Sequence, residues 1–157
     1  MTVTAPPKLQ QTDFVAFGDS ITADEDGWIG VARNLIGAAY PERNIKIVNA
    51  GRGGDRSIDM LARLETNVLT HRPDFVTISA GVNDVWKRYR TRIPAVQYPH
   101  GDGPDGISPE TFEAALSEMV DRIREASDAE VLILSPTVIG ENVDDPGYRP
   151  NAALRAY

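Results

Sequence analysis

The stretch that decides the fold is FVAFGDSIT, residues 14–22. Four mostly apolar residues run into Gly18, and a carboxylate and Ser20 follow at once. A short apolar run without a polar face is typical of a strand covered by helices on both sides. Ser20 is then either a reactive hydroxyl at the end of that strand or a hydroxyl that caps the next turn, and the tripeptide GDS alone favours the cap.

Three further segments share this short apolar character, at residues 45–48, 75–79 and 131–134. Between the predicted strands, apolar residues recur at helical spacing in three stretches. These stripes are Trp28, Val31, Ala32, Leu35, Ile36 and Ala39; Leu61, Leu64 and Val68; and Phe112, Ala115, Leu116, Met119, Val120 and Ile123. Ser108 and Pro109 mark the start of the third helix as N-cap and first helical residue. The alternation predicts an α/β fold with a mostly parallel, doubly wound sheet.

The two ends of the chain differ from this regular pattern. Residues 1–12 read as a flexible leader, and residues 13–157 as a single domain. After the fourth predicted strand, a loop rich in Pro, Gly and Asp opens a helix near Pro150, and the sequence stops at Tyr157. A four-strand sheet that ends inside its fourth helix looks unfinished, so we expect the fold to lack its last helix–strand unit.

Composition excludes several classes of function. The chain has 157 residues, of which 41% are hydrophobic and 25% charged, as in ordinary globular proteins. A formal net charge of −7 argues against nucleic-acid binding, which needs a basic face. The absence of cysteine excludes disulfides and thiolate metal sites. The oligomeric state is not readable from the sequence.

No apolar run is long enough to span a membrane. The N-terminus also lacks the apolar core of a signal peptide. A cytoplasmic location is therefore the default expectation, and a secreted protein whose signal peptide has been removed would read the same way.

Small, polar and glycine residues follow all four predicted strands. They form the segments 18–20, 49–57, 80–86 and 135–137. In an open parallel sheet, ligands bind outside the carboxyl ends of the strands, so these four loops share the edge that matters. The convergence of these four loops at one edge indicates a functional site more strongly than any one tripeptide does.

The residue types at this edge suit acyl transfer. Ser20 brings a hydroxyl and a backbone N–H, and glycines at 51, 53 and 54 allow further N–H groups to approach a ligand closely. Asn83 adds an uncharged amide donor. A hydroxyl among such donors is the arrangement of a nucleophile beside an oxyanion hole.

Three blocks of this chain resemble those of the SGNH hydrolases, also called GDSL esterases or lipases: FGDSIT, NAGRGGD and GVND. The resemblance covers about residues 13 to 157 and implies a flavodoxin-like three-layer α/β/α sandwich, without a metal or an organic cofactor. By position, Ser20 matches the nucleophile and its N–H the first oxyanion donor. Gly54 matches the second donor, through its N–H, and Asn83 the third, through its side chain. Asp19 reads as a residue that braces the turn.

The fourth block of that family, D-x-x-H, has no match here. Of the two histidines, His71 precedes the third strand and belongs to the opposite edge of the sheet. His100 lies on the correct edge, but a loop rich in Gly and Pro is a poor platform for a general base. We therefore expect the natural protein to continue past Tyr157 by a helix, a strand and a D-x-x-H loop, or a separate piece to supply them.

The sequence thus predicts a serine ester hydrolase acting on a small carboxyl ester. Few aliphatic residues in the insertion at 90–107 favour a short acyl or acetyl group. Arg52, Arg56 and that insertion are candidates for substrate contact.

Two other classes of protein remain open. The first is a catalytically dead module of the same fold that binds an acyl or sugar ligand, which the missing D-x-x-H block favours. The second is a flavodoxin-like phosphate or nucleotide binder that uses residues 49–57 as an anion site. It leaves Ser20 and Asn83 unexplained, and Asp19 and Asp55 would repel a phosphate.

Overall fold

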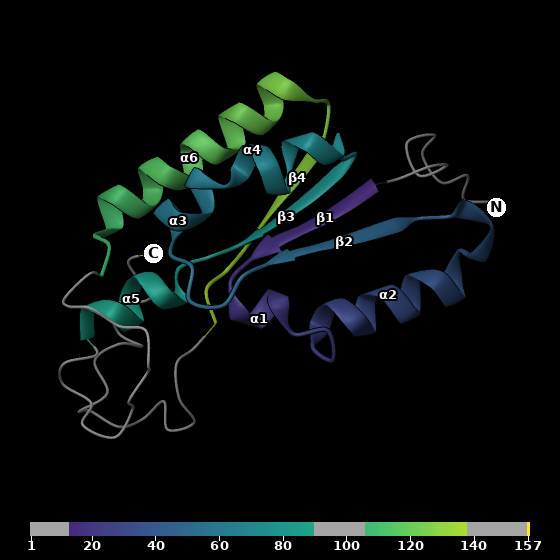
Figure 1. Cartoon of the computed structure of the whole chain (residues 1–157), viewed down its shortest axis with the longest axis horizontal. Helices are drawn as coiled ribbons and strands as arrows, with labels where there is room; N and C mark the ends of the chain where they lie inside the picture. Colours follow the sequence, from purple (N-terminus) through teal and green to yellow (C-terminus); the bar gives the residue numbers. More distant parts are fainter. Residues whose placement is uncertain (1–12, 90–105, 138–156) are drawn as a thin grey trace, which may run out of the picture.

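The computed structural model describes residues 13–89 and 106–137, together with Tyr157. A parallel four-stranded sheet forms its centre, in the order β2-β1-β3-β4 (Figure 1). The strands are β1 (Asp13–Gly18), β2 (Lys46–Gly51), β3 (Phe75–Ser79) and β4 (Glu130–Leu134). All four predicted strands are confirmed, and that at 75–79 has the predicted bounds. The predicted leader and the helix predicted near Pro150 lie outside the described residues.

Helices cover both faces of the sheet and so make the expected three-layer α/β/α sandwich (Figure 1). One face carries α1 (Ser20–Ala23) and α2 (Trp28–Ala39), and the other carries α3 (Ser57–Ala62), α4 (Leu64–Asn67) and α6 (Pro109–Ala126). The helix α5 (Val82–Tyr89) follows β3 at the carboxyl edge, and two short 3₁₀ helices span Pro41–Arg43 and Leu69–His71. The fold class predicted from the alternating pattern is confirmed.

The side chains of β1 show why the sheet needs cover on both faces. Phe14 and Ala16 pack with Ile29 of α2, whereas Val15 and Phe17 belong to the larger core on the other face. Successive side chains of a strand point to opposite faces, and here both sets are buried. The predicted stripe on α6 completes the larger core, and Ser108 caps this helix by accepting a hydrogen bond from the Thr111 N–H.

The stripe predicted for α2 is partly wrong. Val31 and Leu35 are 55% and 65% exposed, and Ile29, which the prediction omitted, is fully buried. The core on this face involves only the first turn of α2, through Trp28 and Ile29. Helical spacing identified the helix correctly, but it could not reveal how much of the helix reaches the sheet.

Three other expectations need correction. The second predicted helix is two short helices, because the backbone leaves the helical region at Arg63, where φ is −109°. Within the described part of the chain, β4 is only partly covered, since Leu132 and Ile133 are about half exposed at the edge of the described sheet. Finally, the segment 80–86 is not a loop throughout, because α5 begins at Val82.

Candidate active site

The strand order brings two of the predicted loops together. The chain passes from β1 to β2 on one side and then returns to β3 on the other, so β1 lies between β2 and β3. A reversal of this kind opens a crevice at the carboxyl edge of a parallel sheet, which is where such folds bind ligands. Ser20 follows β1 and Asn83 follows β3, so both residues lie at this point of the carboxyl edge.

Ser20 is the exposed first residue of α1. The chain turns from β1 into this helix within one residue, which requires glycine at position 18: an added Cβ there would lie 2.2 Å from Thr22 Oγ1. Asp19 caps the helix, because its buried carboxylate accepts a hydrogen bond of 3.0 Å from the Ile21 N–H. This contact agrees with the bracing role expected for Asp19 and leaves the Ser20 side chain at the surface.

The second predicted loop turns sharply beside Ser20. Arg52 N–H donates to the Gly18 carbonyl at 3.0 Å, and Asp55 N–H donates to the Arg52 carbonyl at 3.3 Å, which closes a turn around Gly53 and Gly54. Gly54 has a φ of +81°, a left-handed conformation that favours glycine. A Cβ added to Gly53 would lie 3.9 Å from Ser20 Cβ, so the turn and the serine are neighbours.

Asn83 lies in the first turn of α5. Its amide donates a hydrogen bond of 2.9 Å to the Asp55 carbonyl and a longer one of 3.4 Å to Asp19 Oδ2. An amide nitrogen carries two hydrogens, so one fixes the side chain against the turn and the other is only weakly engaged. Ser20, Gly54 and Asn83 therefore belong to one cluster, as the sequence predicted.

Three carboxylates surround this cluster, and each is stabilised differently. Asp55 is 6% exposed and pairs with Arg63, whose Nε lies 2.5 Å from Asp55 Oδ2. Asp84 is fully buried and accepts hydrogen bonds from both the backbone N–H and the hydroxyl of Ser57. Burial raises the pKa of Asp84, and burial together with the charges of Asp84 and Asp55 raises the pKa of Asp19.

Sequence reasoning missed the two cations that hold this loop. Arg63 donates to the carbonyls of Ala50 and Gly18, at 2.9 and 3.0 Å, and its guanidinium lies 4.6 Å from the centre of the Phe17 ring. Lys87 donates to the Gly54 carbonyl at 2.8 Å. Arg63 lies between α3 and α4, and Lys87 lies in α5, and a lone cation in such a segment reads as a solvated side chain.

The two predicted substrate contacts differ in their surroundings. Arg52 is exposed, with its guanidinium 3.7 Å from Asp55. Arg56 instead pairs with Asp59 at 2.8 Å, at the start of α3. Residues 90–105 of the predicted insertion lie outside the described part of the chain.

No described histidine can act on Ser20. His71 ends the 3₁₀ helix that precedes β3, at the amino end of the strands and thus at the opposite edge from Ser20, as the sequence predicted. His100 lies outside the described residues. Among residues 13–89 and 106–137, no group of acidic or histidine side chains is arranged to hold a metal ion.

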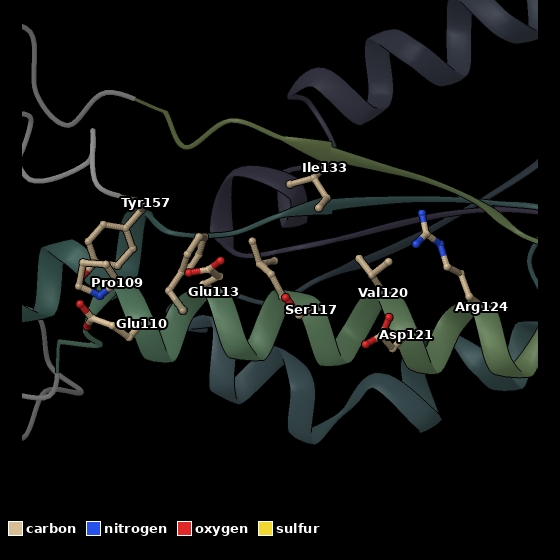
Figure 2. Close-up of a pocket in the computed structure, with 11 residues that line it drawn as sticks. Pro109, Glu110, Glu113, Ser117, Val120, Asp121, Arg124, Ile133 and Tyr157 are labelled. Carbon is tan, nitrogen blue, oxygen red and sulfur yellow. The ribbon is translucent and has the colours of Figure 1, made fainter.

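A groove of about 670 Å³ lies elsewhere, between α6 and β4. Figure 2 shows Glu113, Ser117 and Val120 of α6 on the side that faces Ile133, with Tyr157 at one end. Neither Ser20, Gly54 nor Asn83 lines this groove, so it is separate from the cluster described above. No helix in the described ranges is both long and apolar enough to span a membrane.

Comparison with known proteins agrees with the α/β fold described above. An acetylxylan esterase from Geobacillus stearothermophilus is 31% identical over 123 residues, which are 78% of this chain and 52% of that protein. This chain therefore spans about half the length of that relative. A crystal structure of an acetylxylan esterase from the same organism has a TM-score of 0.71 and 27% identity, covering 95% of this chain and 71% of that one.

Other solved structures extend the comparison. An alpha/beta hydrolase enzyme from the metagenome of Lake Arreo, Spain, has a TM-score of 0.73 and 26% identity, covering 92% of this chain and 68% of that one. Catalytic mutants of the Geobacillus acetylxylan esterase carry alanine in place of a serine, an aspartate or a histidine. The model of the GDSL-like lipase/acylhydrolase family matches residues 16–157. The chain belongs to that family.

Proposed function

We propose that the protein hydrolyses carboxyl esters through an acyl-enzyme formed on Ser20. The observation that carries this proposal is the exposure of Ser20 beside two backbone N–H groups without an acceptor and a side-chain amide. Within the described chain, neither the Ser20 N–H nor the Gly54 N–H donates to a protein acceptor, and the Asn83 amide makes one short hydrogen bond, to the Asp55 carbonyl, and one long one, of 3.4 Å, to Asp19. Donors without an acceptor at the edge of a crevice suit an oxygen atom supplied by a substrate.

The reaction forms and breaks bonds at one carbonyl carbon. Ser20 Oγ attacks this carbon, and the carbonyl oxygen becomes an oxyanion held by the Ser20 N–H, the Gly54 N–H and the Asn83 amide. The tetrahedral intermediate collapses as the bond to the alcohol oxygen breaks, and the alcohol leaves with the proton that Ser20 lost to a general base. Water then attacks the acyl group in the same way, which releases a carboxylic acid and restores Ser20.

The general base lies outside the described residues. No described side chain is hydrogen-bonded to Ser20 Oγ, and His71 is at the wrong edge of the sheet. We assign the base to a histidine oriented by an aspartate, since these residue types are replaced, along with a serine, in the catalytic mutants of the Geobacillus enzyme. This pair completes the relay that turns a weakly nucleophilic hydroxyl into an attacking group.

The favoured substrate is an acetyl ester, such as an acetylated sugar. The support comes from the acetylxylan esterase relative and from the scarcity of aliphatic residues in the insertion at 90–107. The family name also covers lipases, so p-nitrophenyl esters of increasing chain length form the natural comparison with acetylated xylo-oligosaccharides.

Labelling with a fluorophosphonate tests the nucleophile directly. The complete protein should form one adduct, located on Ser20 by mass spectrometry, and the Ser20→Ala variant should form none. Ser117→Ala, which alters an exposed serine on α6, should label like the wild type. An adduct on another residue, or none on the wild type, contradicts the proposal. Binding of an acetylated xylo-oligosaccharide without hydrolysis would then indicate the ligand-binding module.

A further inference from the structure

The turn that carries the Gly54 N–H is held firmly at its two ends and weakly between them. Arg52 is fixed by its N–H bond to Gly18, and Asp55 by its N–H bond to Arg52 and by its ion pair with Arg63. Between these ends stand two glycines, which have no side chains to pack and more backbone freedom than any other residue. Among the described residues, the hydrogen bond from Lys87 is the only one made to either glycine.

Two side chains on one face of α5 donate hydrogen bonds to successive carbonyl groups of this turn. Asn83 donates to the Asp55 carbonyl at 2.9 Å, and Lys87 donates to the Gly54 carbonyl at 2.8 Å. The two donors are four residues apart on a helix, a spacing that places side chains on the same face. The helix thus fixes the turn at two adjacent peptides, and only one of the two contacts comes from a residue assigned to the oxyanion hole.

We propose that Lys87 is a positioning residue for the oxyanion hole: through the Gly54 carbonyl it holds the Gly54–Asp55 peptide against α5, and so limits the position of the Gly54 N–H, on the other side of the same Cα, relative to Ser20 and Asn83. The inference rests on the proposed ester hydrolysis for its catalytic consequence. Its structural part, the anchoring of the two glycines, does not depend on that function.

A carboxylate also lies in the neighbourhood of the ammonium group. The pKa of Asp59 is lowered, chiefly by its hydrogen bonds with Arg56, and the nearby charge of Lys87 contributes to the same shift. Asp59 lies on α3, directly after the turn. The one hydrogen bond of Lys87 among the described residues is therefore that to the Gly54 carbonyl, and the charge of Asp59 favours an ammonium group in this region.

Lys87→Met keeps the length and apolar stem of the side chain and removes its donors. Loss of one oxyanion donor lowers turnover about 10²- to 10³-fold, so loss of the positioning of that donor should lower kcat by about 10- to 100-fold. KM should change less than about threefold, because the N–H contributes mainly in the transition state. Lys87→Arg, which keeps charge and donors, should recover most of kcat.

Lys46→Met is the matched control. Lys46 is an exposed lysine at the start of β2, at the opposite end of the sheet from the turn, and lies 3.9 Å from Asp13. The Lys46→Met variant loses the same charge and gains the same side chain as Lys87→Met, but the change lies away from the site. Its kcat should therefore match that of the wild type. A similar fall of kcat in Lys46→Met would show that overall charge, and not positioning, is responsible.

A measurement on the backbone separates the two proposals. By ¹⁵N relaxation, the Gly53 and Gly54 amides of the complete wild-type protein should have the order parameters of rigid backbone, about 0.85, and Lys87→Met should lower them toward about 0.6. Asp55, held by Arg63, should not change. Unchanged glycine order parameters in Lys87→Met, or an unchanged kcat in an active protein, overturn the inference. A wild type without adduct on Ser20 overturns the proposed function instead, and the order parameters still decide whether Lys87 anchors the turn.

Discussion

Replacing Arg63 by Met should be among the most destabilising single changes in the described chain. Arg63 joins three segments at the carboxyl edge: its guanidinium pairs with Asp55 and donates to the Gly18 and Ala50 carbonyls. The charged side chains of Arg63 and Asp55 are only 11% and 7% exposed. Methionine keeps the apolar stem and leaves the Asp55 carboxylate buried without its main partner.

The magnitude follows from the burial of the orphaned charge. Breaking a buried ion pair by removing one partner costs about 3–5 kcal/mol. Arg52 lies 3.7 Å from the other oxygen of Asp55 and is 71% exposed, so it offers weak residual compensation. We therefore expect a loss near the lower end of that range, about 3 kcal/mol, which is large against a total stability of about 5–15 kcal/mol.

Urea unfolding followed by circular dichroism measures this free energy by linear extrapolation. The double variant Arg63→Met/Asp55→Asn should be at least about 1 kcal/mol more stable than Arg63→Met, because it removes the orphaned charge. Arg33→Met is the control: its ion pair with Glu25 is also short, at 2.7 Å, but 43% and 59% exposed, so about 0–1 kcal/mol is expected. The reasoning fails if Arg63→Met loses less than about 1 kcal/mol, or if Asp55→Asn does not relieve it.

Two further predictions concern backbone space and pH. Gly51→Ala would bring a Cβ within 2.2 Å of the Ala23 nitrogen and should therefore lower the urea midpoint markedly. Gly37→Ala is the control: a Cβ at this exposed position of α2 meets nothing within 4 Å and should raise stability by about 0.5–1 kcal/mol. Equal effects of the two substitutions would contradict the close approach of Gly51 to Ala23. Burial raises the pKa of Asp19 above its ordinary 3.8, so the native state binds this proton more tightly than the unfolded state does. The stability that results from this proton is present below pH 3.8 and is lost as the pH rises through the native pKa. Asp19→Asn should therefore gain stability relative to the wild type between about pH 4 and pH 7, measured by urea unfolding at each pH, and a difference independent of pH would refute this.

The fold was predictable because its signals are local. Each strand is a short apolar run, and α6 has a complete stripe that begins at the Ser108 cap, so periodicity and capping were sufficient. The errors arose where packing against other elements decides whether an apolar side chain is buried. The exposed Val31 and Leu35 on α2 and the exposed Leu132 and Ile133 on β4 satisfy the same apolar pattern as buried residues, and only the position of an element in the layers separates the two cases.

The candidate site was predictable in part, for a topological reason. Ser20 and Asn83 each follow a strand, and strands of one parallel sheet end at the same edge, so their meeting required no knowledge of side-chain contacts. Arg63 and Lys87 could not be found in this way. Their contacts to Gly18 and Gly54 join residues 45 and 33 positions apart, and no sequence spacing encodes such contacts from helix to loop.

These cations bear on how the proposed site could stabilise an oxyanion at an acidic edge of the sheet. Asp19, Asp55 and Asp84 lie close enough for the last two to raise the pKa of the first, so the local field opposes a developing negative charge. Arg63 compensates Asp55, and hydrogen bonds from Ser57 satisfy Asp84, which leaves short-range donors as the means of stabilising the oxygen. Short-range donors act only when they are well placed, because a misplacement of about 1 Å can cost 10²-fold in rate. An oxyanion hole set among carboxylates should therefore depend more on anchors such as Lys87 and Arg63 than one set in a neutral crevice, and kcat should fall further than stability alone predicts when either anchor is removed.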